Sequence, residues 1–362
     1  MQVVQLLPTI SYGDAVGNDT LAIQDIIRQM GYETQIYAEN IDGRLPARTA
    51  MPFLQFPDLS NEDVVIYHGS TGTELNFRLP QLGGRKIMIY HNITPPAFFH
   101  PYSPSAEQLT AFGLQGIENL RDTVDYCIAD SEFNKANLRE MGYPCPMDVC
   151  PVLIPFKDYE RTPNKRILQQ YTEDGYVNIL FTGRVAPNKK QEDIIRAFFY
   201  YHTYYNKRSR LILVGSWNGM EKYYDRLCDY VNQLGLSDSV IFTGHIKFDE
   251  ILAYYRLADV FLCMSEHEGF CVPLVEAMYF DVPIIAYRST AIPDTLGGCG
   301  MLLESKHPKV VAAAIHQIIS DNRFCQKLIE GQRQRLVAFA HESIKQRFVE
   351  LLGSFLEKEG LG

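Results

Sequence analysis

Short apolar runs alternate along the whole chain with segments of helical periodicity. In the first half the runs have the length of buried strands, and the segments between them show an apolar face at helical spacing. The predicted strands are Val3–Leu7, Thr34–Ala38, Val64–His68, Lys86–His91 and Tyr126–Ala129, and the predicted helices include Asn18–Met30, Ser105–Arg121 and Ser131–Met141. Strands separated by helices are typical of βαβ units and parallel sheets.

The second half repeats this pattern. Its predicted strands are Val177–Thr182, Arg210–Val214, Val240–Thr243, Val260–Met264 and Pro283–Ala286, and its predicted helices are Lys190–Tyr201, Gly219–Leu234, Asp249–Leu257 and Pro273–Phe280. Two such series predict an α/β protein with two Rossmann-like domains that face each other. The proline-containing stretch 151–173 is expected to link them, and residues 307–359 are expected to form consecutive helices.

Composition predicts the class of protein and its cellular compartment. The chain has 362 residues, of which 46% are hydrophobic and 21% charged, as in ordinary globular proteins. No apolar run approaches the roughly 18 residues that a membrane span needs, and Met1–Ile10 lacks the basic start of a signal peptide. The eight cysteines are scattered without a CxxC pair. We therefore expect a cytoplasmic protein with free thiols.

The charge is unevenly distributed. The net charge is −9, yet residues 1–160 hold 10 basic and 20 acidic side chains, whereas residues 161–362 hold 24 and 23. Broad nucleic-acid binding needs a basic footprint, so this class of partner is disfavoured. A small anionic ligand held by a few local cations remains compatible with these numbers.

The segment Glu268–Glu276 carries the strongest chemical signal. It follows the predicted strand Val260–Met264, and Pro273 suits the first turn of a helix. Glu268 is therefore expected in a strand-to-helix loop and Glu276 in the first helical turn, at the sheet edge where α/β proteins bind ligands. The N–H groups of a helix start favour an anion there, and the two carboxylates suit sugar hydroxyls. Equally, the pair suits a loop carboxylate and a second one that complements the helix dipole.

A second segment, Gly183–Lys190, follows another predicted strand directly. Arg184 and Lys189 project from this connection and could neutralise a diphosphate, the first as a planar fork and the second as a point charge. The alternative is a pair of solvated cations in a surface loop. Lys190 could replace Lys189, because the register of a loop is not set by the sequence.

Two first-half segments are candidates of lower specificity. His91, in Tyr90–Pro96 at the end of a predicted strand, could face a ligand or be a hydrogen-bonded structural histidine. The segment Tyr12–Asn18 contains Gly17, whose backbone could approach a phosphate. It is not a GxGxxG motif, and neither that fingerprint nor a P-loop occurs elsewhere at a strand-to-helix turn, which disfavours a nicotinamide oxidoreductase.

Together these segments resemble the retaining glycosyltransferases of GT-B fold, family 4, also called glycosyl transferases group 1. The resemblance is most specific from Phe181 to Leu303, through GRVAPNKKQEDII, LILVGS, VIFTGHI, EGFCVPLVEAM and DVPIIAYRSTAIPD, and is looser in the first half. It implies an N-terminal acceptor domain at 1–160, a nucleotide-sugar donor domain at 161–340, and a C-terminal helix within 341–362 that crosses back to the first domain.

The resemblance also implies residue roles. Arg184 and Lys189 are similar to the pair that binds the donor diphosphate, Glu268 to the residue that contacts the sugar hydroxyls, and Glu276 to the residue that holds the ribose. His91 would touch the sugar near the reacting carbon. The remaining implied donor contacts are Gly17, His245, Ile246, Gly269, Phe270, Cys271 and Val275.

The implied activity is transfer of a hexose from a nucleoside diphosphate sugar to a glycan or lipid-linked hydroxyl, with retention and without a metal or other cofactor. The stretch Ala291–Gly298 is similar to that of bacterial family members that use mannose- or rhamnose-type donors. This similarity favours GDP-mannose as the donor, with a UDP-sugar as the alternative. Two rival functions are another GT-B enzyme, such as a nucleotide-sugar epimerase or a phosphorylase, and a catalytically silent nucleotide-sugar-binding subunit. Intact Arg184, Lys189, Glu268 and Glu276 argue against the silent subunit.

Three features depart from the family pattern or extend it. Cys271 stands where glycine is common in the family, and Asn18 follows Gly17 where a second glycine is common. The aromatic and basic stretch from Phe198 to Arg210 could mark a weak peripheral contact with the inner membrane face, or it could be an ordinary half-buried helix end.

Overall fold

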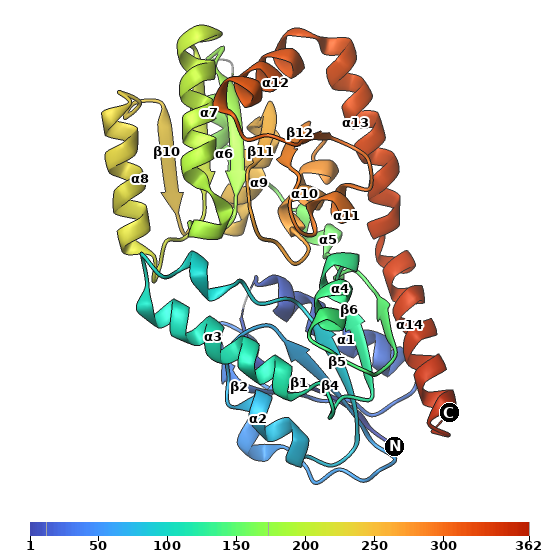
Figure 1. The fold of residues 1–362 in the computed structure, drawn as a ribbon. Helices are drawn as coiled ribbons and strands as arrows, with labels where there is room; N and C mark the ends of the chain where they lie inside the picture. The colour runs from blue at the N-terminus through green and yellow to red at the C-terminus, as the bar shows by residue number, and fades with distance from the viewer. Residues whose placement is uncertain (12, 173, 362) are drawn as a thin grey trace. The chain divides into compact units, whose positions relative to one another are not determined.

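The computed structural model describes residues 1–11, 13–172 and 174–361. The chain divides into two compact units, each built on one parallel sheet (Figure 1). Unit 1 comprises Met1–Pro96, Ser105–Pro155 and Phe339–Gly362, and unit 2 comprises Ala97–Pro104 and Phe156–Ala338. Two parallel sheets with helices confirm the predicted α/β class.

Within the described residues, the sheet of unit 1 has seven strands in the order β3-β2-β1-β4-β5-β6-β7. The strands are β1 (Val3–Ile10), β2 (Ile36–Ile41), β3 (Met51–Pro52), β4 (Val64–Gly69), β5 (Arg85–Tyr90), β6 (Tyr126–Ala129) and β7 (Met147–Val149). β1 pairs with β2 on one side and β4 on the other, both in parallel. The order of strands thus reverses at β1, which is where ligands bind in doubly wound sheets.

The helices of the first half and the end of the chain cover this sheet. They are α1 (Ala15–Gln29), α2 (Leu75–Arg78), α3 (Pro104–Asn119), α4 (Glu132–Glu140) and α14 (His341–Lys358). One apolar cluster joins α1 and α14 to the alternate residues of the strands, among them Ile66 and Ile89. The last helix of the chain therefore belongs to the core of the first unit, and Figure 1 shows it in red beside the blue and green segments.

In unit 2, the described residues form a six-stranded sheet in the order β10-β9-β8-β11-β12-β13. The strands are β8 (Val177–Thr182), β9 (Ser209–Val214), β10 (Val240–Gly244), β11 (Val260–Cys263), β12 (Ile284–Tyr287) and β13 (Met301–Leu303). The helices are α5 (Phe156–Tyr159), α6 (Lys165–Tyr171), α7 (Gln191–Tyr204), α8 (Glu221–Gln233), α9 (Phe248–Leu257), α10 (Val272–Tyr279), α11 (Ile292–Leu296), α12 (Pro308–Ser320) and α13 (Asn322–Leu336). Short 3₁₀ turns occupy Phe53–Gln55, Leu79–Gln81, Pro96–Phe98, Pro187–Lys189 and Val337–Phe339.

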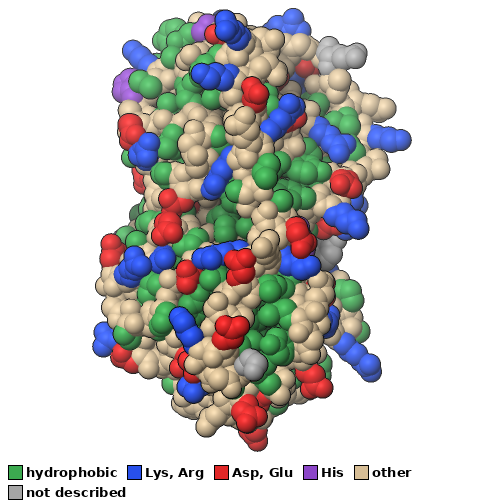
Figure 2. Space-filling model, turned by 90° about the vertical axis from the view of Figure 1, so that its right-hand side faces the viewer, with side chains coloured by type: hydrophobic (Ala, Val, Ile, Leu, Met, Phe, Trp, Pro, Cys, Tyr) green, Lys and Arg blue, Asp and Glu red, His purple; other side chains and the backbone are tan. Residues whose placement is uncertain are grey.

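The surface carries both signs of charge. Figure 2 shows lysine and arginine side chains interspersed with aspartate and glutamate on the face that it presents. Among the described helices, none is long and apolar enough to cross a membrane. In the aromatic and basic stretch, Phe198 and Tyr201 are buried and Arg210 pairs with Asp174, so only part of this stretch meets solvent.

Candidate active site

The two segments with the strongest chemical signal lie side by side at the carboxyl edge of the sheet in unit 2. Each follows one of two paired central strands, β8 and β11. The backbone N–H of Glu266 donates to the carbonyl oxygen of Asn188 at 2.8 Å, and the Asn188 side chain donates to the carbonyl oxygen of His267 at 3.0 Å. The pairing of β8 with β11 therefore places the loop that carries Lys189 against the loop that carries Glu268.

Lys189 and Glu268 form the central ion pair of this region. Lys189 Nζ donates to Glu268 Oε2 at 2.6 Å, and the side chains are 22% and 7% exposed. Burial lowers the pKa of Lys189, but the Glu268 carboxylate outweighs burial and raises it. Lys189 is therefore positively charged at neutral pH, and its charge faces a carboxylate in this structure.

The other two cations of the loop are placed differently. Arg184 is exposed, and its guanidinium lies 3.5 Å from the carbonyl oxygen of Asn218. Lys190 has a left-handed backbone with φ 54° and lies 3.2 Å from Glu266. Lys189, rather than Lys190, is thus the lysine that meets Glu268.

The loop that carries Glu268 is held by two threonines, Thr290 between β12 and α11 and Thr295 within α11. The backbone N–H of Glu268 donates to the Thr290 hydroxyl at 2.9 Å, and the Thr295 hydroxyl donates to the carbonyl oxygen of Phe270. Cys271 caps α10 with φ 74°, a left-handed conformation that glycine adopts readily. This cap conformation suits a residue without Cβ, which is consistent with the glycine that the family resemblance led us to expect here.

Glu276 lies in the second turn of α10, because the helix begins at Val272; the prediction of the first turn was wrong. Its carboxylate accepts hydrogen bonds from two tyrosine hydroxyls, Tyr159 at 3.0 Å and Tyr255 at 2.6 Å. Burial raises the pKa of Glu276, and the two hydroxyl donors partly offset this. The Tyr255 hydroxyl also lies 2.5 Å from Thr182 Oγ1 at the end of β8. No spacing in the sequence indicates these tyrosines, since helices α5 and α9 bring them in.

Two of the implied donor contacts, His245 and Ile246, directly follow β10. His245 is exposed and Ile246 is partly buried, directly after Gly244 ends the strand. Trp217 stacks on Tyr224 with ring centroids 4.0 Å apart and also contacts Gly244. Its ring is therefore used in packing. Val275 is fully buried inside α10, so neither its side chain nor its backbone is exposed in this structure, and Gly269 is part of the loop already described.

In unit 1, Gly17 lies inside α1, three residues after the N-cap Asp14, rather than in a loop before the helix. Its N–H donates to the Asp14 carboxylate at 3.3 Å. A Cβ at Gly17 would lie 2.8 Å from the carbonyl oxygen of Ser11, so close backbone approach requires a glycine here. Tyr12, the first residue of the predicted phosphate segment, lies outside the described residues.

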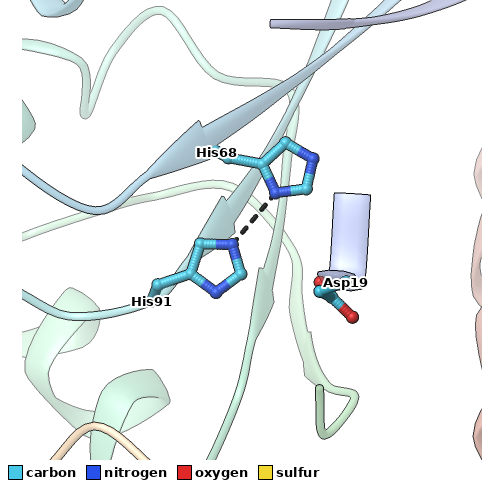
Figure 3. A group of neighbouring side chains, drawn as sticks. All are labelled: Asp19, His68 and His91. Atoms are coloured by element: carbon cyan, nitrogen blue, oxygen red, sulfur yellow. Dashed lines mark hydrogen bonds between the residues drawn. The ribbon is translucent and has the colours of Figure 1, made fainter. Parts of the chain in front are cut away.

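His91 belongs to a buried row of polar side chains on one face of the sheet in unit 1 (Figure 3). His91 Nε2 lies 2.9 Å from His68 Nδ1, and His91 Nδ1 lies 2.9 Å from Asp130 Oδ2. His68 Nε2 lies 3.0 Å from Gln5 Oε1. Asp19, on α1, covers this row, and its carboxylate accepts the Leu153 N–H at 2.7 Å.

The hydrogen-bond directions in the row fix its protons. Gln5 Nε2 donates to the Thr20 carbonyl, so Gln5 Oε1 faces His68 and must accept from it. Burial lowers the pKa of His68 well below its usual value, so His68 is neutral and its Nδ1 accepts from His91. Burial also lowers the pKa of His91, but Asp130 outweighs this and raises it. The pair of His91 and Asp130 therefore holds a proton.

Both ring nitrogens of His91 are thus occupied in this structure. The side chain is only 4% exposed, and the proton that it holds is shared with the equally buried Asp130. Atoms of Asp19, His68 and His91 lie within 4.8 Å of one another. The ring nitrogens there already share hydrogen bonds with their neighbours. The sequence did not indicate Gln5, His68 or Asp130 as partners.

Comparisons with known proteins give a family match that covers most of unit 2. Residues 164–335 match the family described as "Glycosyl transferases group 1". The chain is 25% identical over 264 residues to the O-antigen chain mannosyltransferase B of Escherichia coli, covering 71% of this chain and 66% of that protein. It is 31% identical over 166 residues to a D-inositol 3-phosphate glycosyltransferase of Acidothermus cellulolyticus, covering 44% of this chain and 36% of the relative. The chain thus matches just under two thirds of the first relative and about a third of the second.

Two solved structures share the whole fold. Sucrose-phosphate synthase from Thermosynechococcus elongatus superposes with a TM-score of 0.74 at 18% identity, covering 99% of this chain and all of that one. Anabaena HepE, in complex with UDP and glucose, superposes with a TM-score of 0.75 at 18% identity, covering 98% and 100%. At this identity the likeness shows the fold, and it confirms the predicted GT-B class.

Proposed function

Since the chain has the GT-B fold and residues 164–335 form a glycosyl transferases group 1 domain, we propose that the protein is a hexosyltransferase. It takes the hexose from a nucleoside diphosphate sugar and transfers it to an acceptor hydroxyl with retention at the anomeric carbon. Unit 2 is the donor unit, and unit 1, with its acidic excess, serves the acceptor. In this proposal the transfer of the hexose needs no divalent metal.

The observation that carries this proposal is the contact between Lys189 and Glu268 at the carboxyl edge of the sheet. It joins a cation suited to phosphate and a carboxylate suited to sugar hydroxyls within 2.6 Å, beside the start of α10. Arg184, exposed in the same loop, adds a second cation for the diphosphate. Glu276 would exchange a tyrosine hydroxyl for the ribose hydroxyls.

The chemical step is a displacement on one face of the sugar. The acceptor oxygen bonds to the anomeric carbon while the bond from that carbon to the phosphate oxygen breaks. The acceptor proton passes to the leaving phosphate. Negative charge grows on the nucleotide as it leaves, and Arg184, Lys189 and the N-terminus of α10 stabilise it, as preorganised charges and dipoles do in other enzymes. Glu268 holds hydroxyls and is not a covalent nucleophile.

The donor we favour is GDP-mannose, with a UDP-sugar as the alternative. Support comes from the curated relative named a mannosyltransferase for the first, and from the HepE complex with UDP and glucose for the second. The acceptor is a glycan or lipid-linked glycan, which places the protein in polysaccharide biosynthesis. His91 supplies positive charge near the sugar, and Gly17 supports the helix start that approaches the distal phosphate.

A thermal-shift panel of GDP-, UDP-, ADP- and dTDP-sugars, with and without EDTA, tests the donor assignment. The true donor raises Tm by an amount that grows with the logarithm of its excess over its Kd, with or without EDTA. Arg184→Ala abolishes the shift, whereas Arg28→Ala, at an exposed position of unit 1 where Arg28 pairs with Asp25, leaves it unchanged. A shift of equal size in Arg184→Ala would refute the proposed site.

Product analysis then tests the reaction itself. Incubation of the donor with an acceptor glycan should yield a product of retained anomeric configuration by NMR. Mass spectrometry of the quenched enzyme should show no hexose on Glu268. A trapped Glu268 adduct would show that the reaction is a double displacement through a covalent intermediate and not a displacement on one face. Donor binding without turnover would favour the catalytically silent subunit.

A further inference from the structure

Two buried thiols and a carboxylate converge next to the ion pair of Lys189 and Glu268. Cys263 ends β11, Cys271 caps α10, and Glu268 lies in the loop between them. The two Sγ atoms and one carboxylate oxygen lie within 4.8 Å of one another. The three residues are 0%, 7% and 7% exposed. Ligand atoms of this kind, gathered at one point, are the set that borderline and soft divalent cations bind.

The backbone of Cys271 is an independent sign of a constraint. A residue with a Cβ pays about 1–2 kcal/mol to adopt the left-handed conformation that Cys271 holds at φ 74°. Glycine would avoid this cost, yet the chain places a thiol there and points it toward Cys263. Strained residues of this kind concentrate at functional sites.

We propose that Cys263, Cys271 and Glu268 form a binding site for a thiophilic divalent cation such as Zn²⁺. The cation gains two bonds to sulfur and one to a carboxylate oxygen, and the two thiol protons pass to solvent. A water molecule completes a tetrahedral set, as in other zinc sites with three protein ligands.

The charges around the site balance when it is filled. Two thiolates and one carboxylate carry three negative charges, which the divalent cation and the ammonium group of Lys189 neutralise. Lys189 can keep its contact with the second carboxylate oxygen, since a carboxylate binds a metal through one oxygen and a cation through the other. The Lys189 and Glu268 side chains are 22% and 7% exposed, so the ion pair next to the site meets solvent, and we infer that the ion enters there.

Cadmium is the probe for this site, because cadmium–thiolate bonds absorb in the ultraviolet. Unit 1 holds a second thiol pair, Cys127 and Cys145, with Sγ atoms 3.5 Å apart. The titration therefore uses full-length protein with Cys127→Ser, in a phosphine reductant. One equivalent of Cd²⁺ should produce the thiolate absorption, and excess Mg²⁺ should not remove it.

Three further substitutions in this background separate the outcomes. Cys263→Ser and Cys271→Ser should each lower the affinity for Cd²⁺ at least about tenfold, and Glu268→Gln should keep the absorption but weaken binding about tenfold. Zn²⁺ should displace Cd²⁺ from the parent protein. If a serine variant does not fold, as judged by circular dichroism, the Cd²⁺-dependent rise in Tm of the parent and of Glu268→Gln replaces it. Thiolate absorption that persists in both serine variants, or its absence in the parent protein, overturns the proposal.

Discussion

At the scale of single residues, the stability of the candidate site depends on the pairing of Lys189 with Glu268. Removing the lysine charge leaves a carboxylate that is 7% exposed without its partner. We expect Lys189→Met to lower the free energy of unfolding by about 3 kcal/mol, since an unpaired buried charge is costly. Urea denaturation measures this loss.

Lys190→Met is the matched control for that prediction. Lys190 pairs with Glu266, which Lys306 also contacts, so the control should cost less than about 1 kcal/mol. Adding Glu268→Gln to Lys189→Met should recover most of the loss. Equal losses in the two lysine variants would show that Lys189 and Glu268 are not coupled.

Cys271 provides a test of backbone strain. At this left-handed position, Cys271→Gly should be more stable than Cys271→Ala by about 1 kcal/mol, because only alanine pays the steric cost of φ 74°. At Cys299, which is not among the positive-φ residues, the order should reverse. Thermal unfolding of the four variants measures both differences. The same order of stability at both positions would show that the backbone at Cys271 is not strained.

Asp19 makes stability depend on pH. Burial raises the pKa of Asp19 from 3.8 to about 7, although His91 lowers it in part. Between these values the folded state keeps a proton that the unfolded chain has lost, so this contribution falls as pH rises through about 7. Asp19→Asn carries no such proton and can still accept the Leu153 N–H. We expect the Tm of Asp19→Asn to rise relative to wild type between about pH 5 and pH 8.

The exposed Asp25→Asn is the control for this titration, and its Tm should run parallel to that of wild type. A constant gap between Asp19→Asn and wild type over the same range would mean that Asp19 is already ionised in the folded protein. The sequence could not indicate this carboxyl, because its burial depends on the packing of α1 over the sheet.

At the scale of secondary structure elements, the sequence predicts buried strands well and element ends less well. Tyr126–Ala129 and Val177–Thr182 coincide with β6 and β8, since an apolar run is all that a buried strand needs. The predicted strand Thr34–Ala38 instead lies at Ile36–Ile41, because backbone pairing with β1 continues through polar Asn40. The helix predicted from Asn18 starts at Ala15, where Asp14 caps it.

Helix α14 is the element whose tertiary contacts lie farthest away in the sequence. Phe348 is 2% exposed in the core that α1 and the strands of unit 1 share. Phe348→Ala should therefore destabilise the protein by about 3 to 5 kcal/mol. Ser354→Ala, at an exposed position of the same helix, should change stability by less than about 0.5 kcal/mol. Denaturant unfolding compares them, and a small effect of Phe348→Ala would show that α14 is only loosely attached.

The candidate site was predictable to the extent that it follows strand ends. The loops after β8 and β11 were expected to carry ligand groups, and the topology of paired strands explains why they meet. The hydroxyls of Tyr159 and Tyr255 on Glu276 were not predictable, because they come from helices whose positions only the folded chain defines. The same holds for Gln5 and His68 around His91.

At the scale of the whole molecule, the assignment of the donor to unit 2 makes a spatial prediction. Hydrogen exchange with the nucleoside diphosphate of the true donor should show the strongest protection in the loops 183–190 and 265–271, since binding there suppresses local opening. Mass spectrometry of peptides from both units measures this. Protection confined to unit 1 would assign the donor to the other half of the chain, and Arg184→Ala should remove it from unit 2.

The path of the chain has a consequence for recombining these units with those of related proteins. A chimera joined once, near residue 155, would carry α14 from one parent and the sheet that it covers from the other. The same chimera would take the short segment Ala97–Pro104 from one parent and the rest of unit 2, with which this segment packs, from the other. Unit exchange therefore needs junctions near 96, 104, 155 and 338, and libraries that cut the gene at one place should return mostly misfolded protein.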